Sequence, residues 1–216
     1  KISEYMLFGA VADGEYEMIN DRNLSFTSTI FFGDAREPVK MIWDTGSSQL
    51  IVEIEECNNC IGDLYDTSDD ATFTPIPNTD STVYYGSATA SGYSATDKVC
   101  LVDDVAVDAC VTSFPLFAVT SAQGLDSIDG IVGCSSGFDT VNSDPLMVDY
   151  LFDQGKITAR KFAFSLGKED EVSFMDIGLI DTSHMSDPAD LVWLDADPED
   201  YWWTTDVEGF RFTSYD

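Results

Sequence analysis

The chain contains few basic residues and a single histidine. Ten Lys and Arg residues stand against 40 Asp and Glu residues among 216, so the formal net charge is −30. Such a surface repels phosphate backbones and anionic membranes, which excludes nucleic acid as an expected partner. Protonation of carboxylates in an acidic compartment would relieve the self-repulsion, although the charge also fits an ordinary solvated surface. His184 stands alone in an acidic stretch and is interpreted as a surface residue.

Long apolar runs are also missing, and none reaches the ~20 residues that cross a bilayer. We therefore predict no membrane span. An apolar content of 44% and an aromatic content of 12% exclude a disordered acidic tail and allow a substantial core. The chain begins at Lys1 without a charged and then apolar leader, so we expect a processing site or the edge of a fragment there.

Short apolar and alternating runs, separated by turn residues, are typical of an all-β sandwich or barrel. One helix is expected after the Ser143-Asp144-Pro145 cap and ends near Gly155. Thr67–Asp80 is polar and is interpreted as an exposed loop. Examples of the predicted strands are Ser25–Phe32, Val39–Trp43, Gln49–Ile54, Thr82–Ala88 and Lys98–Val102, and the strands Lys161–Leu166 and Val172–Gly178 follow the helix.

One carboxylate stands in an unusual setting, directly after an apolar strand. Asp44 is followed by Thr45, Gly46, Ser47 and Ser48. Gly46 allows a tight turn beside the acid, and the hydroxyl groups of Thr45 and Ser47 lie within reach of it. A structural turn does not require an acid, a glycine and three hydroxyl groups together, so this loop is a candidate catalytic site.

This loop resembles the active-site loop of the pepsin-like aspartic proteases, and further motifs of that family follow in order. Phe26–Gly33 resembles the strand that leads towards the catalytic loop. Val83–Gly92 resembles the flap, a hairpin that closes over substrate, and Asp129–Gly133 the segment that packs across the catalytic loop. Leu151–Leu166 resembles the helix and strand that close the first lobe, and Tyr201-Trp202-Trp203 the start of the second lobe. The resemblance covers roughly residues 20–210.

The resemblance implies an all-β, pepsin-like acid-protease lobe, a closed β-barrel or sandwich with a flap hairpin and one short helix. It implies an aspartic endopeptidase that cleaves polypeptides between apolar residues at acidic pH without a metal or cofactor. Residues 21–182 would form the amino-terminal catalytic lobe, and 183–216 the connector and the start of the second lobe. Residues 1–20 would be an amino-terminal extension, a remnant of a zymogen pro-segment or a first strand.

Individual site residues follow from the same resemblance. Asp44 would be one half of the catalytic pair, with Thr45, Gly46 and Ser47 supporting its loop. Tyr85, Gly86 and Ser87 would form the flap, although an ordinary hairpin with an exposed tyrosine is the alternative. Ile128 and Ile131, with Phe114 and Phe117, would line the apolar pocket beside the cleaved bond, unless they are core residues. Trp202 and Trp203 are interpreted as aromatics that pack between lobes.

The second catalytic aspartate does not occur in the sequence. Asp66, Asp139 and Asp181 are each followed by Thr but lack the glycine. The second acid would lie on another chain or a carboxy-terminal lobe, or the protein would be a non-catalytic peptide-binding or structural relative. A retroviral type of dimer is disfavoured because its subunits are far shorter than this chain.

Five cysteines indicate an oxidising compartment. A hairpin would bring Cys100 and Cys110 opposite each other, and the family resemblance favours a small disulfide loop between Cys57 and Cys60. A zinc site at this CxxC is the alternative, but it lacks a second ligand pair. Cys134 is left buried and free or paired outside the chain. The sequon at Asn23 adds a glycosylation site, so we expect a secreted, lysosomal or vacuolar protein.

Overall fold

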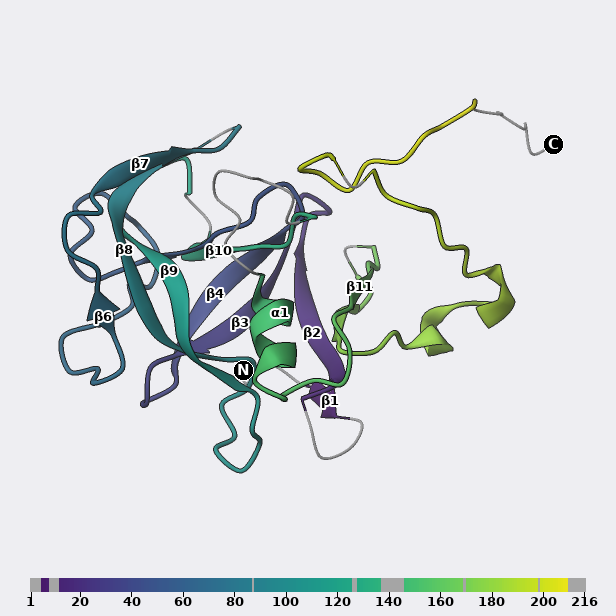
Figure 1. The fold of residues 1–216 in the computed structure, drawn as a ribbon, viewed down its shortest axis with the longest axis horizontal. Helices are drawn as coiled ribbons and strands as arrows, with labels where there is room; N and C mark the ends of the chain where they lie inside the picture. Colours follow the sequence, from purple (N-terminus) through teal and green to yellow (C-terminus); the bar gives the residue numbers. More distant parts are fainter. Residues whose placement is uncertain are drawn as a thin grey trace.

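The computed structural model describes residues 5–7, 12–86, 88–125, 128–136, 146–168, 170–197 and 199–209. These residues form twelve β-strands, one α-helix and two short 3-10 helices (Figure 1). The helix is α1 (Met147–Asp153), and the 3-10 helices are η1 (Thr182–His184) and η2 (Pro188–Asp190). The strands are β1 (Tyr5–Leu7), β2 (Gly14–Asp21), β3 (Ser25–Phe32), β4 (Glu37–Asp44), β5 (Leu50–Glu53), β6 (Thr74–Pro75), β7 (Ser81–Tyr84), β8 (Thr89–Cys100), β9 (Cys110–Gln123), β10 (Gly130–Gly133), β11 (Phe162–Ser165) and β12 (Ser173–Ile177).

Six of the strands close into a barrel. They follow the order β3-β4-β10-β5-β9-β8, and β8 pairs back onto β3 through Cys100 and Val99. The pairs β4–β10 and β5–β9 are parallel, whereas the other pairs of the barrel are antiparallel. This all-β architecture with a single short α-helix confirms the predicted fold class.

A second group of strands extends the sheet away from the barrel. The end of β2 pairs with β3, and the rest of β2 pairs with β12. β12 in turn pairs with β11, and β1 pairs with β2 over residues 14–16. Figure 1 shows β2 and β11 beside α1, with the C-terminal segment running outwards from this side. Because β2 belongs to this sheet, residues 14–20 pair with β3 and β12 as a strand.

Buried and exposed residues alternate along the strands, and the buried side chains form the core. In β4, Val39, Met41 and Trp43 are buried, while Lys40 between them is exposed. Period-2 patterning directs one face of the strand inward, so the strand delivers its last residue, Asp44, to the rim of the barrel. In α1, Met147, Val148 and Leu151 are buried, and Gly155 follows with a φ of 69°. The predicted cap at 143–145 lies outside the described residues.

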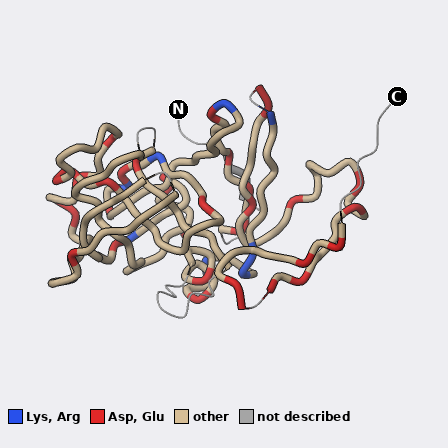
Figure 2. The backbone as a smooth tube through the Cα atoms, turned by 90° about the horizontal axis from the view of Figure 1, so that it is seen from above, with Lys and Arg blue, Asp and Glu red and all other residues tan. Residues whose placement is uncertain are grey.

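Acidic residues are distributed over the whole molecule and gather along the outlying C-terminal segment (Figure 2). Basic residues are sparse in the same view, as the sequence count requires. Among the helices in the described ranges, none is both long and apolar enough to span a membrane.

Candidate active site

Asp44 stands at the end of β4, where a buried strand meets an exposed loop. Trp43 is 8% exposed, and its Nε1 donates a hydrogen bond to Oγ of Ser28 on β3 at 2.6 Å. This contact fixes the strand immediately before the acid. Asp44 itself is half-buried, and the two residues that follow are exposed.

Two donors hold the carboxylate of Asp44. The amide nitrogen of Gly46 donates to Oδ1 at 2.9 Å, and Oγ of Ser47 donates to Oδ2 at 2.6 Å. A Cβ atom at position 46 would lie 3.2 Å from Oδ1, so glycine permits the close approach of the backbone. Each oxygen of the carboxylate is thereby oriented, which is a requirement for an acid that acts on a substrate.

Thr45 points elsewhere. It is exposed and lines a second pocket, and the described residues receive no hydrogen bond from its hydroxyl group. The Asp44 carboxylate is therefore held by Gly46 and Ser47, and the expected contact from the Thr45 hydroxyl is not made. A supporting role for Thr45 in the loop stays a prediction.

β10 supports the loop from behind. It runs parallel to β4 with Gly133 opposite Asp44, and the amide of Cys134 donates to the Asp44 carbonyl at 2.7 Å. The amide of Ser135 donates to the carbonyl of Ser47 at 2.9 Å. A Cβ atom on Gly133 would lie 2.4 Å from the carbonyl carbon of Ser48, so the packing leaves no room for a side chain.

The hairpin of β7 and β8 covers the same rim of the barrel. The amide of Tyr85 donates to the carbonyl of Ala88 at 2.8 Å, and a cavity of about 770 Å³ lies between this hairpin and the Asp44 loop. Burial, and next the negative charge of Asp44, raise the pKa of the Tyr85 hydroxyl. Asp44, Gly46, Ser47, Tyr85 and Gly86 therefore line one cavity. Ser87 lies outside the described residues.

Two buried residues, Ala88 just before β8 and Ile51 on β5, belong to the apolar cluster beside this hairpin. Ala88 is not among the described residues with a positive φ, so alanine is compatible with the backbone at this position. Ile51 is fully buried in an apolar cluster against which Tyr85 packs. Packing against that cluster holds the ring of Tyr85 in place, while the described residues contribute no hydrogen bond to its hydroxyl group.

Ile128 and Ile131 belong to the apolar cluster that packs against Tyr85, and they do not line the 770 Å³ cavity. Ile131 is 5% exposed and Ile128 is half-buried. Phe114 and Phe117 line a smaller cavity of about 150 Å³ that shares Ser48 and Gln49 with the larger one. A direct contact of the two isoleucines with substrate stays a prediction.

Sequence reasoning missed the position of Tyr201 and Trp202. Both line the cavity that contains Asp44. Nε1 of Trp202 donates to the carbonyl of Gly46 at 3.3 Å, and the Tyr201 hydroxyl donates to Oγ of Ser48 at 3.2 Å. These contacts join positions more than 150 residues apart, so local patterning carries no signal for them; only the aromatic character of the segment marks it.

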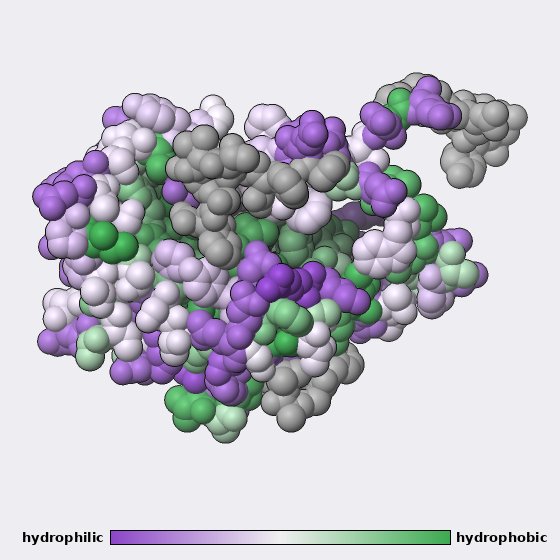
Figure 3. Space-filling view, in the orientation of Figure 1, coloured by the Kyte–Doolittle hydropathy of each residue, from purple (hydrophilic) through white to green (hydrophobic). Residues whose placement is uncertain are grey.

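A second and more apolar pocket of about 560 Å³ lies on the other side of the Asp44 loop. Thr45, Phe162 and Phe164 line it together with Trp193 and Trp203. Nε1 of Trp203 donates to the carbonyl of Cys134 at 2.7 Å, which holds this segment against β10. Figure 3 shows apolar residues in the recess between the body of the molecule and the outlying C-terminal segment.

The cysteines are arranged as the sequence predicts. Disulfides join Cys57 to Cys60 and Cys100 to Cys110, and Cys134 is a buried free thiol. Because both sulfurs of the CxxC motif are bonded to each other, the alternative of a zinc site there is wrong. Burial, and next the charge of Asp44, raise the pKa of the Cys134 thiol. Asn23 is exposed in the turn between β2 and β3, and its glycosylation stays a prediction.

Comparisons with known proteins identify the family of this chain. The family described as eukaryotic aspartyl protease matches residues 25–215. Vacuolar protease A of Arthroderma otae is 29% identical over 196 residues, which cover 85% of this chain and 47% of the relative. Cathepsin D of Dictyostelium discoideum is 28% identical over 82% of this chain and 47% of the relative. Plasmepsin IV of Plasmodium falciparum (isolate 3D7) is 29% identical over 89% of this chain and 43% of the relative.

The chain spans less than half the length of each of these relatives. The match of the family to 25–215 nevertheless includes the Asp44 loop, the β7–β8 hairpin and the aromatic segment at 201–203. The chain therefore belongs to the eukaryotic aspartyl protease family.

Proposed function

We propose that this chain is the amino-terminal lobe of an aspartic endopeptidase that hydrolyses peptide bonds between apolar residues at acidic pH. The observation that carries the proposal is the Asp44 carboxylate, held by Gly46 and Ser47 at the rim of a cavity under the flap. Asp44 would act with a second aspartate that lies outside this sequence, on a carboxy-terminal lobe or a second chain.

The chemistry requires two carboxylates that share one proton. Two like charges at close range cannot both ionise easily, so one acid stays protonated while the other is charged. The charged carboxylate takes a proton from water, which attacks the scissile carbonyl carbon, and the protonated acid donates to the carbonyl oxygen. The hydrogen bonds from Gly46 and Ser47 would keep the Asp44 oxygens aimed at that water.

The flap supplies the surface for an extended substrate. The end of the β7–β8 hairpin presents backbone groups beside the cavity, and a peptide in the cavity would pair with them as a further strand. Tyr85 would cover the reacting bond and exclude water, with Gly86 and Ser87 beside it. Apolar residues of the substrate would contact the surface to which Ile128 and Ile131 contribute.

An acidic vacuole or lysosome is the proposed location. The name vacuolar protease A of one relative supports it, as does a formal net charge of −30, which partial protonation would reduce. The proposal includes the two disulfides and a glycan at Asn23, which suit a secretory route.

The test uses the longest natural polypeptide that contains this chain. It should cleave a denatured protein at acidic pH, and a statine-type inhibitor should block the cleavage. Asp44→Asn should reduce kcat by at least about 10³-fold, because the pair cannot share its proton. Asp69→Asn removes the same charge from an exposed loop and should leave cleavage unchanged.

Two outcomes would contradict the proposal. Cleavage that persists in Asp44→Asn would assign the activity to another site. A correctly folded wild-type protein that binds peptides and shows no cleavage would instead establish a non-catalytic binding protein of the same family.

A further inference from the structure

A group of chemically reactive side chains lies far from the Asp44 loop, where η1 packs on the sheet. Glu15 on β2 stands directly opposite Asp176 on β12 in the antiparallel ladder. His184 of η1 stacks on Phe174 of β12, with ring centroids 4.8 Å apart and an angle of 21° between the planes. The single histidine of the chain thereby lies against this sheet, in contact with Glu15.

Three ligand atoms converge in this group. One oxygen of Glu15, one oxygen of Asp181 and one ring nitrogen of His184 lie within 4.8 Å of one another. Nε2 of His184 contacts Oε2 of Glu15 directly. A second contact fixes the loop, because the amide of Asp181 donates to Oδ2 of Asp176 at 2.7 Å. The stacking and these bonds hold the ligand atoms in place before any ion arrives.

Asp176 supplies an independent observation. Its side chain is in contact with the loop that carries Asp181, the residue is 4% exposed, and no described group donates a hydrogen bond to its Oδ1. A buried carboxylate oxygen without a partner is costly, and such an atom commonly marks an ion or a water.

Negative charge exceeds positive charge in the group. Glu15, Asp176 and Asp181 contribute three carboxyl groups, and within the described ranges His184 is their one partner in an ion pair. Glu15 and His184 have side-chain exposures of 10% and 30%, so a small solute can reach the group from one side. A divalent cation would balance the carboxylates better than one imidazole does.

We propose that Glu15, Asp181 and His184 bind a divalent cation of the Zn²⁺ type. One imidazole nitrogen and two carboxylate oxygens are common zinc ligands at about 2.0–2.2 Å, whereas Ca²⁺ and Mg²⁺ favour oxygen donors alone. A water in the fourth position donates a hydrogen bond to Oδ1 of Asp176, which gives that atom its missing partner. The cation replaces the proton between His184 and Glu15 and ties the segment after β12 to β2.

The experiment is a calorimetric titration of ZnCl₂ into the longest natural polypeptide, stripped with a chelator, at neutral pH. The wild type should bind Zn²⁺ at this site, and His184→Gln and Glu15→Gln should each weaken that binding at least tenfold. Glu17→Gln is the matched control, since Glu17 lies on the same strand and pairs with Phe174, outside the ligand set. At about 100 times the dissociation constant, Zn²⁺ should raise the Tm by roughly 5–10 °C in wild type and control.

A chemical probe on the wild type keeps the proposal testable if a variant fails to fold. Zn²⁺ should protect His184 from carbethoxylation by diethyl pyrocarbonate, measured by mass spectrometry on the peptide that carries it. Zinc binding that survives His184→Gln, an unprotected His184 at saturating Zn²⁺, or equal affinity for Ca²⁺ would each overturn the proposal.

Discussion

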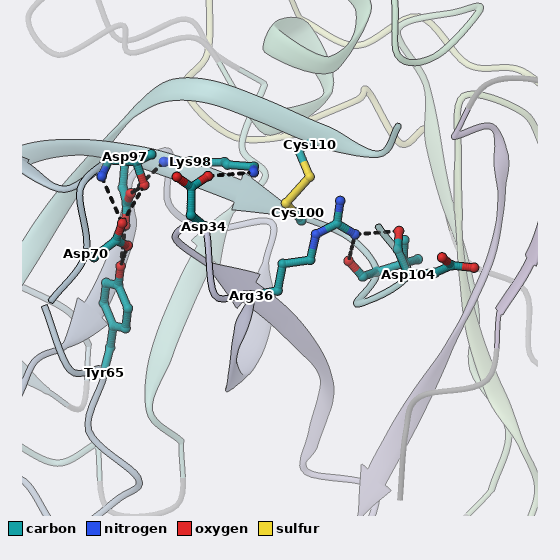
Figure 4. Close-up of polar contacts among 11 residues, drawn as sticks. Asp34, Arg36, Tyr65, Asp70, Asp97, Lys98, Cys100, Asp104 and Cys110 are labelled. Carbon is teal, nitrogen blue, oxygen red and sulfur yellow. Dashed lines mark hydrogen bonds and ion pairs between the residues drawn. A yellow bond between two sulfur atoms is a disulfide. The ribbon is translucent and has the colours of Figure 1, made fainter. Parts of the chain in front are cut away.

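The hydroxyl group of Tyr65 lies 2.6 Å from Oδ2 of the fully buried Asp97 and also contacts Oδ2 of Asp70 (Figure 4). One hydroxyl proton cannot serve two carboxylates. Burial raises the pKa of Asp97, whereas at Asp70 the hydrogen bonds from Tyr65 and Thr72 outweigh burial and lower the pKa. When Asp97 is protonated in acid, it can donate to Tyr65, which in turn donates to Asp70, so that all three groups are satisfied.

This chain of hydrogen bonds predicts a protein that is more stable in acid. A carboxyl group whose pKa is raised by folding stabilises the protein fully below its unfolded pKa, and that contribution is lost as the pH rises through the folded pKa. Asp129 and Glu37 change the stability with pH in the same direction, because burial raises the pKa of each. The free energy of unfolding should therefore increase when the pH falls from 7 towards 4.

The substitution Asp97→Asn tests this relation. An amide can donate to Tyr65 at every pH and still accept from Thr72 and the Lys98 amide, so the variant should be more stable than wild type at pH 7. Its pH dependence should be flatter in equilibrium denaturation. Asp69→Asn on the exposed loop should leave the slope unchanged, and a steeper slope in Asp97→Asn would contradict the assignment.

Gly133→Ala should displace the Asp44 loop through packing alone. The new methyl group would lie 2.4 Å from the carbonyl carbon of Ser48 and 2.5 Å from the amide nitrogen of Gln49, both of which are backbone atoms that cannot rotate away. The loop must shift, and with it the Ser47 donor. We expect a loss of about 2 kcal/mol in stability and at least a tenfold loss in cleavage rate.

Gly86→Ala is the control for the stability of Gly133→Ala, because it adds the same methyl group at an open position. A Cβ atom at position 86 meets nothing within 4 Å, so denaturation should detect a change within about 0.5 kcal/mol. Equal destabilisation by both substitutions would show that close packing at Gly133 is not the cause.

Local patterns predicted the parts of the fold that are set by neighbouring residues. The predicted strand Ser25–Phe32 agrees with β3 to the residue, because its apolar residues are bounded by turns on both sides. The strands predicted at 161–166 and 172–178 each extend one residue beyond β11 and β12 at either end. The Asp44 loop could be identified because its acid, its glycine and its hydroxyl residues are adjacent in the sequence.

Features that depend on tertiary contacts could not be predicted from the sequence. β8 and β9 are 12 and 14 residues long, whereas the predicted strand Lys98–Val102 overlaps only the end of β8. Small residues such as Ala90, Gly92 and Ala95 weaken the apolar alternation, and packing against the facing strand compensates for it. The closure of β8 onto β3 and the position of Trp202 beside Gly46 depend on residues far apart in the chain.

Loss of the Cys100–Cys110 disulfide should cost more stability than loss of Cys57–Cys60. The loops closed by the two bonds differ in length, and chain entropy gives about 3 and 2 kcal/mol for them. Arg36 also holds the longer loop, since its Nη1 donates to the carbonyls of Val102 and Asp104 at 2.9 and 2.5 Å (Figure 4). Double alanine variants compared by denaturation would measure the difference, and the reverse order would contradict this account.

Trp202→Ala should weaken substrate binding in the complete enzyme. The indole ring is 56% exposed, lines the cavity that contains Asp44 and donates to the carbonyl of Gly46. Removing this surface from a bound peptide should raise KM roughly five- to tenfold, with a smaller effect on kcat, because in the proposed complex the ring would contact the substrate rather than the reacting atoms. Steady-state kinetics on an acid-cleaved peptide would give both constants.

Trp193→Ala is the matched control for that measurement. Trp193 is 71% exposed and lines the second pocket beyond Thr45, so its removal deletes the same side chain from a different surface. Its KM should stay within about twofold of wild type. If the two variants raise KM equally, the effect comes from a general change in the C-terminal segment, and Trp202 does not contact the substrate.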